Sequence, residues 1–199
     1  MKKKLSAAGL IPTKAGLILF FNFSFLILNN SFAQTIAGGG EHSLTLCSDS
    51  TVRAWGYNNN GQLGNGTNTN TNVPVQVSAL AGITAIAGGI EHSLSLKIDG
   101  TVRAWGWNNW GQLGNGTNTT SNAPVQLSAL SGITAIAGGS NHSLALKNDG
   151  TVRAWGRNLN GQLGNGTNTD SNVPVQVSAL SGITAIAGGV AHSLALKND

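Results

Sequence analysis

The sequence has 199 residues, of which 11 are Lys or Arg, 7 are Asp or Glu and one is Cys. Four of the 11 basic residues lie before residue 34, so the rest of the chain carries seven basic and seven acidic residues and no formal net charge. A neutral chain lacks the basic surface that a phosphate backbone requires, which argues against a nucleic-acid partner, and a lone Cys47 excludes an internal disulfide.

Residues 1–33 differ in composition from the rest of the chain. Four lysines are followed by an apolar run at 16–28, and small residues end at Ala33. This order predicts a secretory signal peptide that is cleaved after Ala33. The alternative is an uncleaved membrane anchor, but the run is shorter than the ~18–20 apolar residues that span a bilayer, and Asn22 interrupts it. We therefore expect a secreted, periplasmic or cell-surface protein without a membrane span after cleavage.

A fifty-residue unit repeats through the remaining chain without insertion. Three whole copies occupy 38–87, 88–137 and 138–187, and a partial fourth copy occupies 188–199. Repetition at this period is typical of propellers and solenoids, in which each unit buries its apolar face against the next. We therefore assign 34–199 to one repeat domain.

Each unit contains four short segments rich in Val, Ile, Thr and Trp, without a helical period. In the middle copy they lie at 83–87, 93–96, 101–105 and 124–127, and Asp99-Gly100 between the second and third is typical of a tight hairpin. Pro124 begins the fourth segment, which favours an outer edge strand because proline donates no ladder hydrogen bond. The pattern predicts an all-β protein made of β-propeller blades with four antiparallel strands each; a solenoid of stacked hairpins is the alternative.

Three motifs recur in phase with the repeat, namely GQLGNG (61–66, 111–116 and 161–166), AGGxxHSL and TVRAWGxN. In these motifs the chain resembles the regulator of chromosome condensation repeat family, whose repeats form seven-bladed propellers. The resemblance implies about three blades and the start of a fourth, which is an incomplete ring. We expect a truncated, exported member of that family, either a fragment of a longer protein or an arc that closes by self-association.

The residues that could carry chemistry fit structural roles better. Trp55 and its copies never vary and lie on a strand, which predicts packing between blades. His42 recurs in every copy, but blade-related atoms lie too far apart to share one metal ion, so we expect a hydrogen-bonded structural histidine. Ser43 points to the opposite side of its strand and cannot pair with His42 as a nucleophile. We therefore predict no enzyme, no catalytic residues, no cofactor and no metal.

Differences between the copies concentrate in two loops, between the first and second strands and between the third and fourth. Alternating strand direction places both loops on one face, whereas the hairpin on the opposite face keeps Thr-Val-Arg in all three copies. Several variable positions hold residue types that anchor interfaces. The alternative is neutral drift, with the aromatic side chains packed on neighbouring turns. The expected binding face includes Tyr57, Trp107, Trp110, Arg157, Glu41, Glu91 and Asn141.

Two functions from different classes follow from these observations. The first is an exported, non-enzymatic propeller that binds a protein or glycan through its variable loop face. The second is a structural spacer or adhesin module of a larger cell-surface protein, which the near identity of the copies favours. The resemblance also implies guanine-nucleotide exchange, the activity of the family's nuclear founder, but the leader and the neutral charge make that function the least favoured.

Overall fold

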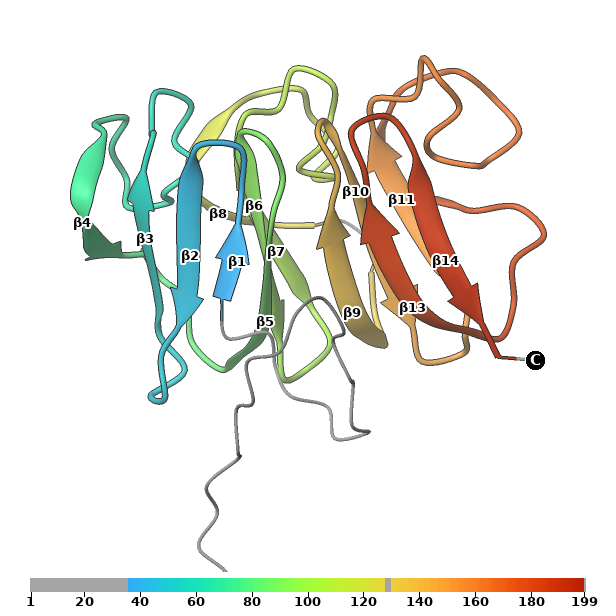
Figure 1. Ribbon diagram of the computed structural model, residues 1–199, viewed down its shortest axis with the longest axis horizontal. Coiled ribbons are helices and arrows are strands. Elements are labelled where there is room, and N and C mark those ends of the chain that lie inside the picture. The colour runs from blue at the N-terminus through green and yellow to red at the C-terminus, as the bar shows by residue number, and fades with distance from the viewer. Residues whose placement is uncertain (1–35, 128–129, 199) are drawn as a thin grey trace, which may run out of the picture. The chain divides into compact units, whose positions relative to one another are not determined.

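A computed structural model describes residues 36–127 and 130–198 (Figure 1). All of these residues belong to one compact unit. The predicted signal peptide at 1–33 lies outside the described residues. Within the described ranges, no helix has the length and apolar character needed to cross a membrane.

The described residues form fourteen β-strands and no helix. Blade 1 consists of β1 (Ile36–Gly38), β2 (His42–Leu46), β3 (Val52–Gly56) and β4 (Thr71–Gln76). Blade 2 consists of β5 (Ile83–Gly88), β6 (His92–Lys97), β7 (Val102–Gly106) and β8 (Ser121–Gln126). Blade 3 consists of β9 (Ile133–Gly138), β10 (His142–Lys147), β11 (Val152–Gly156) and β12 (Ser171–Gln176). The last two strands are β13 (Ile183–Gly188) and β14 (Ser193–Lys197).

Each blade is a four-stranded antiparallel sheet whose strands follow one another in chain order, and β13 and β14 form a two-stranded sheet. The prediction of an all-β protein with three propeller blades and the start of a fourth is therefore confirmed, and the ring is not closed within the described residues. The second strand of each blade packs against the first strand of the next. The blades thus stand side by side, as Figure 1 shows.

The strands follow the two-residue period of β side chains. In blade 1, Leu44 on β2 opposes Ala54 on β3, and both are buried, whereas Arg53 next to Ala54 is exposed. The hairpin between β6 and β7 is closed by a bond from the Lys97 amide to the Thr101 carbonyl at 2.9 Å. Gly100 takes a φ of 77° in this turn, a left-handed conformation that glycine adopts without a Cβ clash.

The fourth strand begins three residues earlier than the sequence pattern predicts. In blade 2 we expected 124–127, but β8 runs from Ser121 to Gln126, so Pro124 lies inside the strand rather than at its start. The register between β7 and β8 shifts between Ala104 and Gly106. This irregularity and the position of β8 at the outer edge of the sheet accommodate a residue without an amide hydrogen. The other three strands of blade 2 agree with their predicted ranges to within one residue at either end.

The core lies between blades, because the tryptophans of blades 2 and 3 each enter the core of the blade before them. Trp105 of blade 2 is fully buried among Leu44, Leu63 and Val77 of blade 1. Its indole Nε1 donates a 2.8 Å hydrogen bond to the carbonyl of Gln62. Trp155 of blade 3 occupies the same position in the core of blade 2. The predicted role of these tryptophans in packing between blades is confirmed for both.

Candidate binding face

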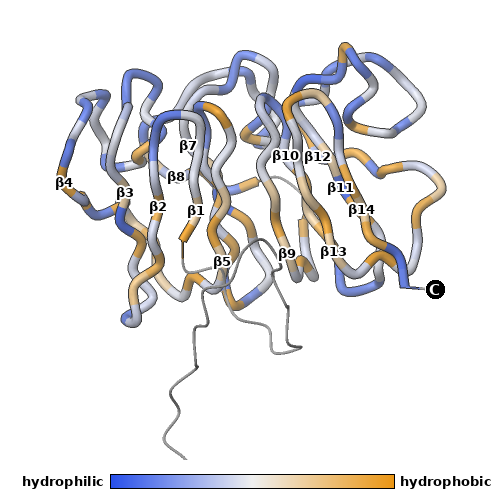
Figure 2. The backbone as a smooth tube through the Cα atoms, viewed as in Figure 1, coloured by the Kyte–Doolittle hydropathy of each residue, from blue (hydrophilic) through white to orange (hydrophobic). Residues whose placement is uncertain are grey.

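The two variable loops lie on the same face of the blades. Figure 1 shows the β1–β2 and β13–β14 turns at the top of the view and the β2–β3 hairpin at the bottom. Backbone bonds also join the two loops within each blade, since the amides of Tyr57, Trp107 and Arg157 donate to the carbonyls of the 41, 91 and 141 positions at 2.9, 2.8 and 2.9 Å. We call this side the loop face. Figure 2 shows its loops as mostly hydrophilic.

A buried asparagine gives the long loop between the third and fourth strands its shape. In blade 2 this residue is Asn108, whose Oδ1 accepts a bond from the Leu113 amide at 2.8 Å. Its Nδ2 donates to the carbonyls of Thr117 at 2.9 Å and Thr119 at 3.0 Å. Asn58 does the same in blade 1 and Asn158 in blade 3. The loop is therefore a fixed platform, on which the neighbouring variable positions are displayed.

This positioning role was not predicted from the sequence, although its signal was present. The asparagine is the last residue of the TVRAWGxN motif and is unchanged in all three copies, directly beside the most variable position. An asparagine side chain with a donor and an acceptor group can bridge several backbone groups of one loop. An invariant asparagine next to a variable residue would thus have indicated a rigid display loop.

Four of the seven predicted residues form one group at the boundary between blades 2 and 3. The rings of Trp107 and Trp110 meet edge to face, with centroids 6.5 Å apart and an interplanar angle of 83°. The Arg157 guanidinium carbon lies 4.9 Å from the centroid of the Trp110 ring. Asn141 is bound to Arg157 through its backbone carbonyl. We call these four residues the tryptophan cluster.

The tryptophan cluster contains polar atoms that are buried without a hydrogen-bond partner. These are the indole Nε1 of Trp110, the Nε of Arg157 and the Oδ1 of Asn141. Two of them are donors and one is an acceptor. Burial of an unpaired polar atom costs free energy. The cluster therefore combines aromatic surface with unused hydrogen-bonding capacity.

The other three predicted residues lie on the neighbouring blades. Glu91 follows the β5 strand of blade 2, and its Oε2 accepts a 3.2 Å bond from Asn60 of blade 1. Tyr57 and Glu41 belong to blade 1 and are joined by their backbones. The structure thus places all seven residues on the loop face but brings only four together. The blade 1–2 boundary is polar, whereas the blade 2–3 boundary is aromatic.

The recurring histidines connect the blades. His92 Nε2 lies 2.9 Å from Ser143 Oγ of blade 3, and Ser143 Oγ donates to the Gln112 carbonyl at 2.9 Å. Since the serine hydrogen is used in that bond, the histidine must donate from Nε2. A histidine that donates here cannot take the serine proton, so the pair is not a nucleophile and base. The same arrangement links His42 to Ser93.

Burial sets the protonation state of these histidines. Loss of hydration lowers the pKa of His92 from 6.5 to about 3, and lowers the pKa of His42 and His142 to about 4. Each ring also covers a glycine, because a Cβ at Gly39, Gly89 or Gly139 would overlap it. The expectation of a hydrogen-bonded structural histidine is confirmed. Its partner, a serine of the next blade, was not predicted from the sequence.

The fold and the loop face define the chain as a β-propeller repeat protein. A family model described as RCC1-like domain matches residues 6–197, and the chain belongs to that family. Over 50 residues it is 46% identical to the ultraviolet-B receptor UVR8 of Arabidopsis thaliana, a match that covers 25% of this chain and 11% of that protein.

Solved structures show the same fold. Human WBSCR16 matches with a TM-score of 0.74 and 28% identity, over 82% of this chain and 44% of that chain. Prp20p of Saccharomyces cerevisiae, a protein that binds Gsp1p and histones, matches with a TM-score of 0.73 and 24% identity, over 84% of this chain and 44% of that chain. A second structure shows Prp20 bound to Kap60. The chain therefore spans less than half the length of these relatives.

Proposed function

We propose that this chain is an exported, non-enzymatic propeller protein that binds another macromolecule through the tryptophan cluster of its loop face. The observation that carries the proposal is where the near-identical copies differ. Their two most variable loops lie on one face, and Trp107, Trp110, Asn141 and Arg157 lie together there across the boundary between two blades. Export rests on the lysines, apolar run and small residues of 1–33.

The chemistry of the tryptophan cluster suits a protein interface. Tryptophan and arginine are the residue types that most often dominate binding free energy, because they bury a large area at a small rotamer cost. The underlying platform is rigid, so little conformational entropy is lost on binding. The part-buried ring of Trp107 supplies apolar contact area.

One relative of known structure binds other proteins. Prp20p binds Gsp1p and histones, and Prp20 has been solved bound to Kap60. These are properties of that protein, and the low identity carries over only the fold. For this chain the kind of partner is inferred from the chemistry of the loop face. A protein or glycan of the cell surface fits the proposed export.

The alternative function is a structural spacer or adhesin module in a larger cell-surface protein. The observation that favours it is the near identity of the copies, in which TVRAWG and GQLGNG are unchanged three times. A spacer needs only the interfaces between blades. If the chain is a spacer, substitutions in the tryptophan cluster should leave its binding to cell-surface proteins and glycans unchanged.

Binding to an array of immobilised cell-surface proteins and glycans separates the two functions. The double variant Trp107→Ala/Trp110→Ala should bind its partner at least ~30-fold more weakly, as expected for loss of an interface anchor. Ile98→Ala is the matched control, because Ile98 is 81% exposed on the opposite hairpin. Equal binding by both variants and the parent chain would exclude the cluster and favour the spacer.

A further inference from the structure

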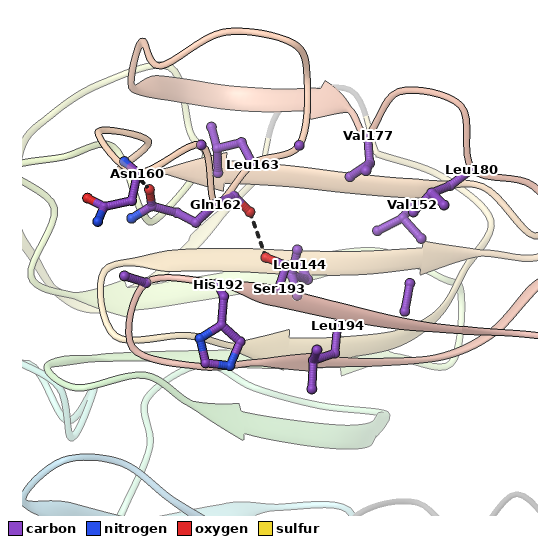
Figure 3. Close-up of a pocket in the computed structure, with 14 residues that line it drawn as sticks. Leu144, Val152, Asn160, Gln162, Leu163, Val177, Leu180, His192, Ser193 and Leu194 are labelled. Carbon is purple, nitrogen blue, oxygen red and sulfur yellow. Dashed lines mark hydrogen bonds between the residues drawn. The ribbon is translucent and has the colours of Figure 1, made fainter.

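The boundaries between neighbouring blades share one scaffold beneath the loop face. At each boundary a serine of the second strand donates to a glutamine carbonyl of the preceding blade, at 2.8 Å for Ser93, 2.9 Å for Ser143 and 2.7 Å for Ser193. Figure 3 shows the last of these bonds, from Ser193 to Gln162, with the Asn160 side chain beside it. Because this scaffold is constant, the residues at the variable positions set the chemistry of each boundary.

The charge reverses between the first boundary and the second. Between blades 1 and 2, Glu91 Oε2 accepts a 3.2 Å bond from Asn60 Nδ2. Between blades 2 and 3, the equivalent positions hold Asn141 and Trp110. Arg157 lies at this second boundary, with its guanidinium carbon 4.9 Å from the centroid of the Trp110 ring. The first boundary therefore carries a carboxylate, and the second carries a guanidinium.

Neither charge is neutralised by a neighbour. Among residues 36–127 and 130–198, the only ion pairs are two that lie on the opposite hairpins. Asp170, the carboxylate of the long loop in blade 3, accepts a 2.6 Å bond from the Asn158 amide and makes no ion pair with Arg157. A guanidinium that stacks on an indole keeps in-plane N–H groups for a second partner. Glu91 and Arg157 are thus both open to groups of opposite charge.

Two indoles connect the opposite charges. The Trp107 amide donates to the Glu91 carbonyl at 2.8 Å, and the rings of Trp107 and Trp110 have centroids 6.5 Å apart. Arg157 stacks on Trp110 from blade 3. The side chains of all four residues are half-buried. We call Glu91, Trp107, Trp110 and Arg157 the mixed-charge row, because a carboxylate, two indoles and a guanidinium follow one another across blade 2.

The order of charges in this row selects between classes of partner. A complementary partner presents a cation to Glu91, apolar groups to the indoles and a carboxylate to Arg157. Charged glycans generally carry groups of one sign, so an anionic glycan that paired with Arg157 would be repelled by Glu91. A protein segment can carry both signs within a few residues. The mixed-charge row therefore favours a protein over a glycan.

We infer that the partner of the loop face is a protein segment in which a basic and an acidic residue flank an apolar one. The inference rests on the proposed function, because it names the class of partner for the same face. The basic residue of the segment pairs with Glu91, and the apolar residue packs on Trp107 and Trp110. The acidic residue accepts hydrogen bonds from the guanidinium of Arg157.

The test uses the full chain and a phage-display library of random peptides of about 12 residues, which span ~40 Å when extended. The parent chain should enrich peptides with a basic and an acidic residue on either side of an apolar one. Glu91→Lys should enrich peptides with acidic residues on both sides, and Arg157→Glu should enrich peptides with basic residues on both sides. Asp49→Lys is the matched control, because it makes the same charge change at an exposed carboxylate of an opposite hairpin.

Affinity gives the second measurement. In fluorescence anisotropy, the peptide that the parent chain enriches most should bind about tenfold more weakly to Glu91→Lys and to Arg157→Glu. Its affinity for Asp49→Lys should equal its affinity for the parent chain. Circular dichroism of each variant checks that the β-structure is retained.

Three results would overturn the inference. The first is enrichment of the same peptides by the parent chain, Glu91→Lys and Arg157→Glu. The second is no enrichment of any peptide by the folded parent chain. The third is saturable binding of polygalacturonate, a carboxylated glycan, that Arg157→Glu abolishes and Glu91→Lys strengthens. If Trp107→Ala/Trp110→Ala still loses binding to the cell-surface array in any of these cases, the proposed function holds and only the class of partner is wrong.

Discussion

Mild acid should destabilise this propeller through its buried histidines. Burial lowers the pKa of His42 and His142 from 6.5 to about 4, and that of His92 to about 3. A base whose pKa is depressed in the folded state contributes stability that is fully present above pH 6.5. That stability is lost as the pH falls from 6.5 toward 4, because in this window only the unfolded chain takes up the proton.

The size of the effect follows from the pKa difference. Each pH unit inside the window removes 1.36 kcal/mol per histidine, so going from pH 7 to pH 5 should lower the free energy of unfolding by about 2 kcal/mol per histidine and by about 6 kcal/mol for the three. Titration of Asp99 does not contribute to this comparison. Hydrogen bonds from Thr101 and Lys97 hold the pKa of Asp99 below its ordinary 3.8, so Asp99 stays charged at pH 5.

The assay is urea unfolding at pH 7 and pH 5. The variant His92→Gln retains a donor for Ser143 but cannot titrate, so its loss of stability between the two pH values should be smaller by about 2 kcal/mol. His192→Gln is the control, because His192 is exposed. The reasoning would be refuted if the parent chain and His92→Gln lost the same free energy of unfolding between pH 7 and pH 5.

Three further predictions concern the repeat itself, and urea unfolding checks each of them. Ser50 has a φ of 62° where the other two blades have glycine, so Ser50→Gly should raise the free energy of unfolding by about 0.5 kcal/mol, and a decrease would contradict this. Gly139→Ala should lower it by about 3 kcal/mol, since the new Cβ overlaps the His142 ring; an unchanged midpoint would disprove the contact. Trp155→Ala should lower the free energy of unfolding by about 3–5 kcal/mol, because its indole is fully buried in the preceding blade. Trp55→Ala should lower it by less than about 1.5 kcal/mol, because that ring is only partly buried. Equal losses would be inconsistent with indole insertion between blades.

The sequence predicted the blades well because the signals for strands are local. The range 83–87 and the Asp99-Gly100 turn can be recognised from a few neighbouring residues. The start of the fourth strand was wrong because Pro124 was taken as a boundary. The irregular register of the edge strand, which tolerates proline, depends on its pairing with β7 and has no local signature.

Packing of the tryptophans between blades was predicted, but the polar contacts between blades were not. The bond between His92 and Ser143 joins residues 51 positions apart, and nothing near either residue indicates the partner. The loop face was predicted from the positions at which the copies differ. Stacking of Arg157 on Trp110 was not predicted, because it depends on how blades 2 and 3 are placed side by side.

The central claim is that the tryptophan cluster contacts a partner, and site-specific photocrosslinking tests it most directly. A photoreactive amino acid replaces Trp107 in one variant and Ile98, on the opposite hairpin, in another. Each variant is produced in the cells that make the protein and is irradiated. The account predicts a discrete covalent adduct from position 107 and none from position 98. Adducts of equal yield from both positions, or from neither, would contradict it.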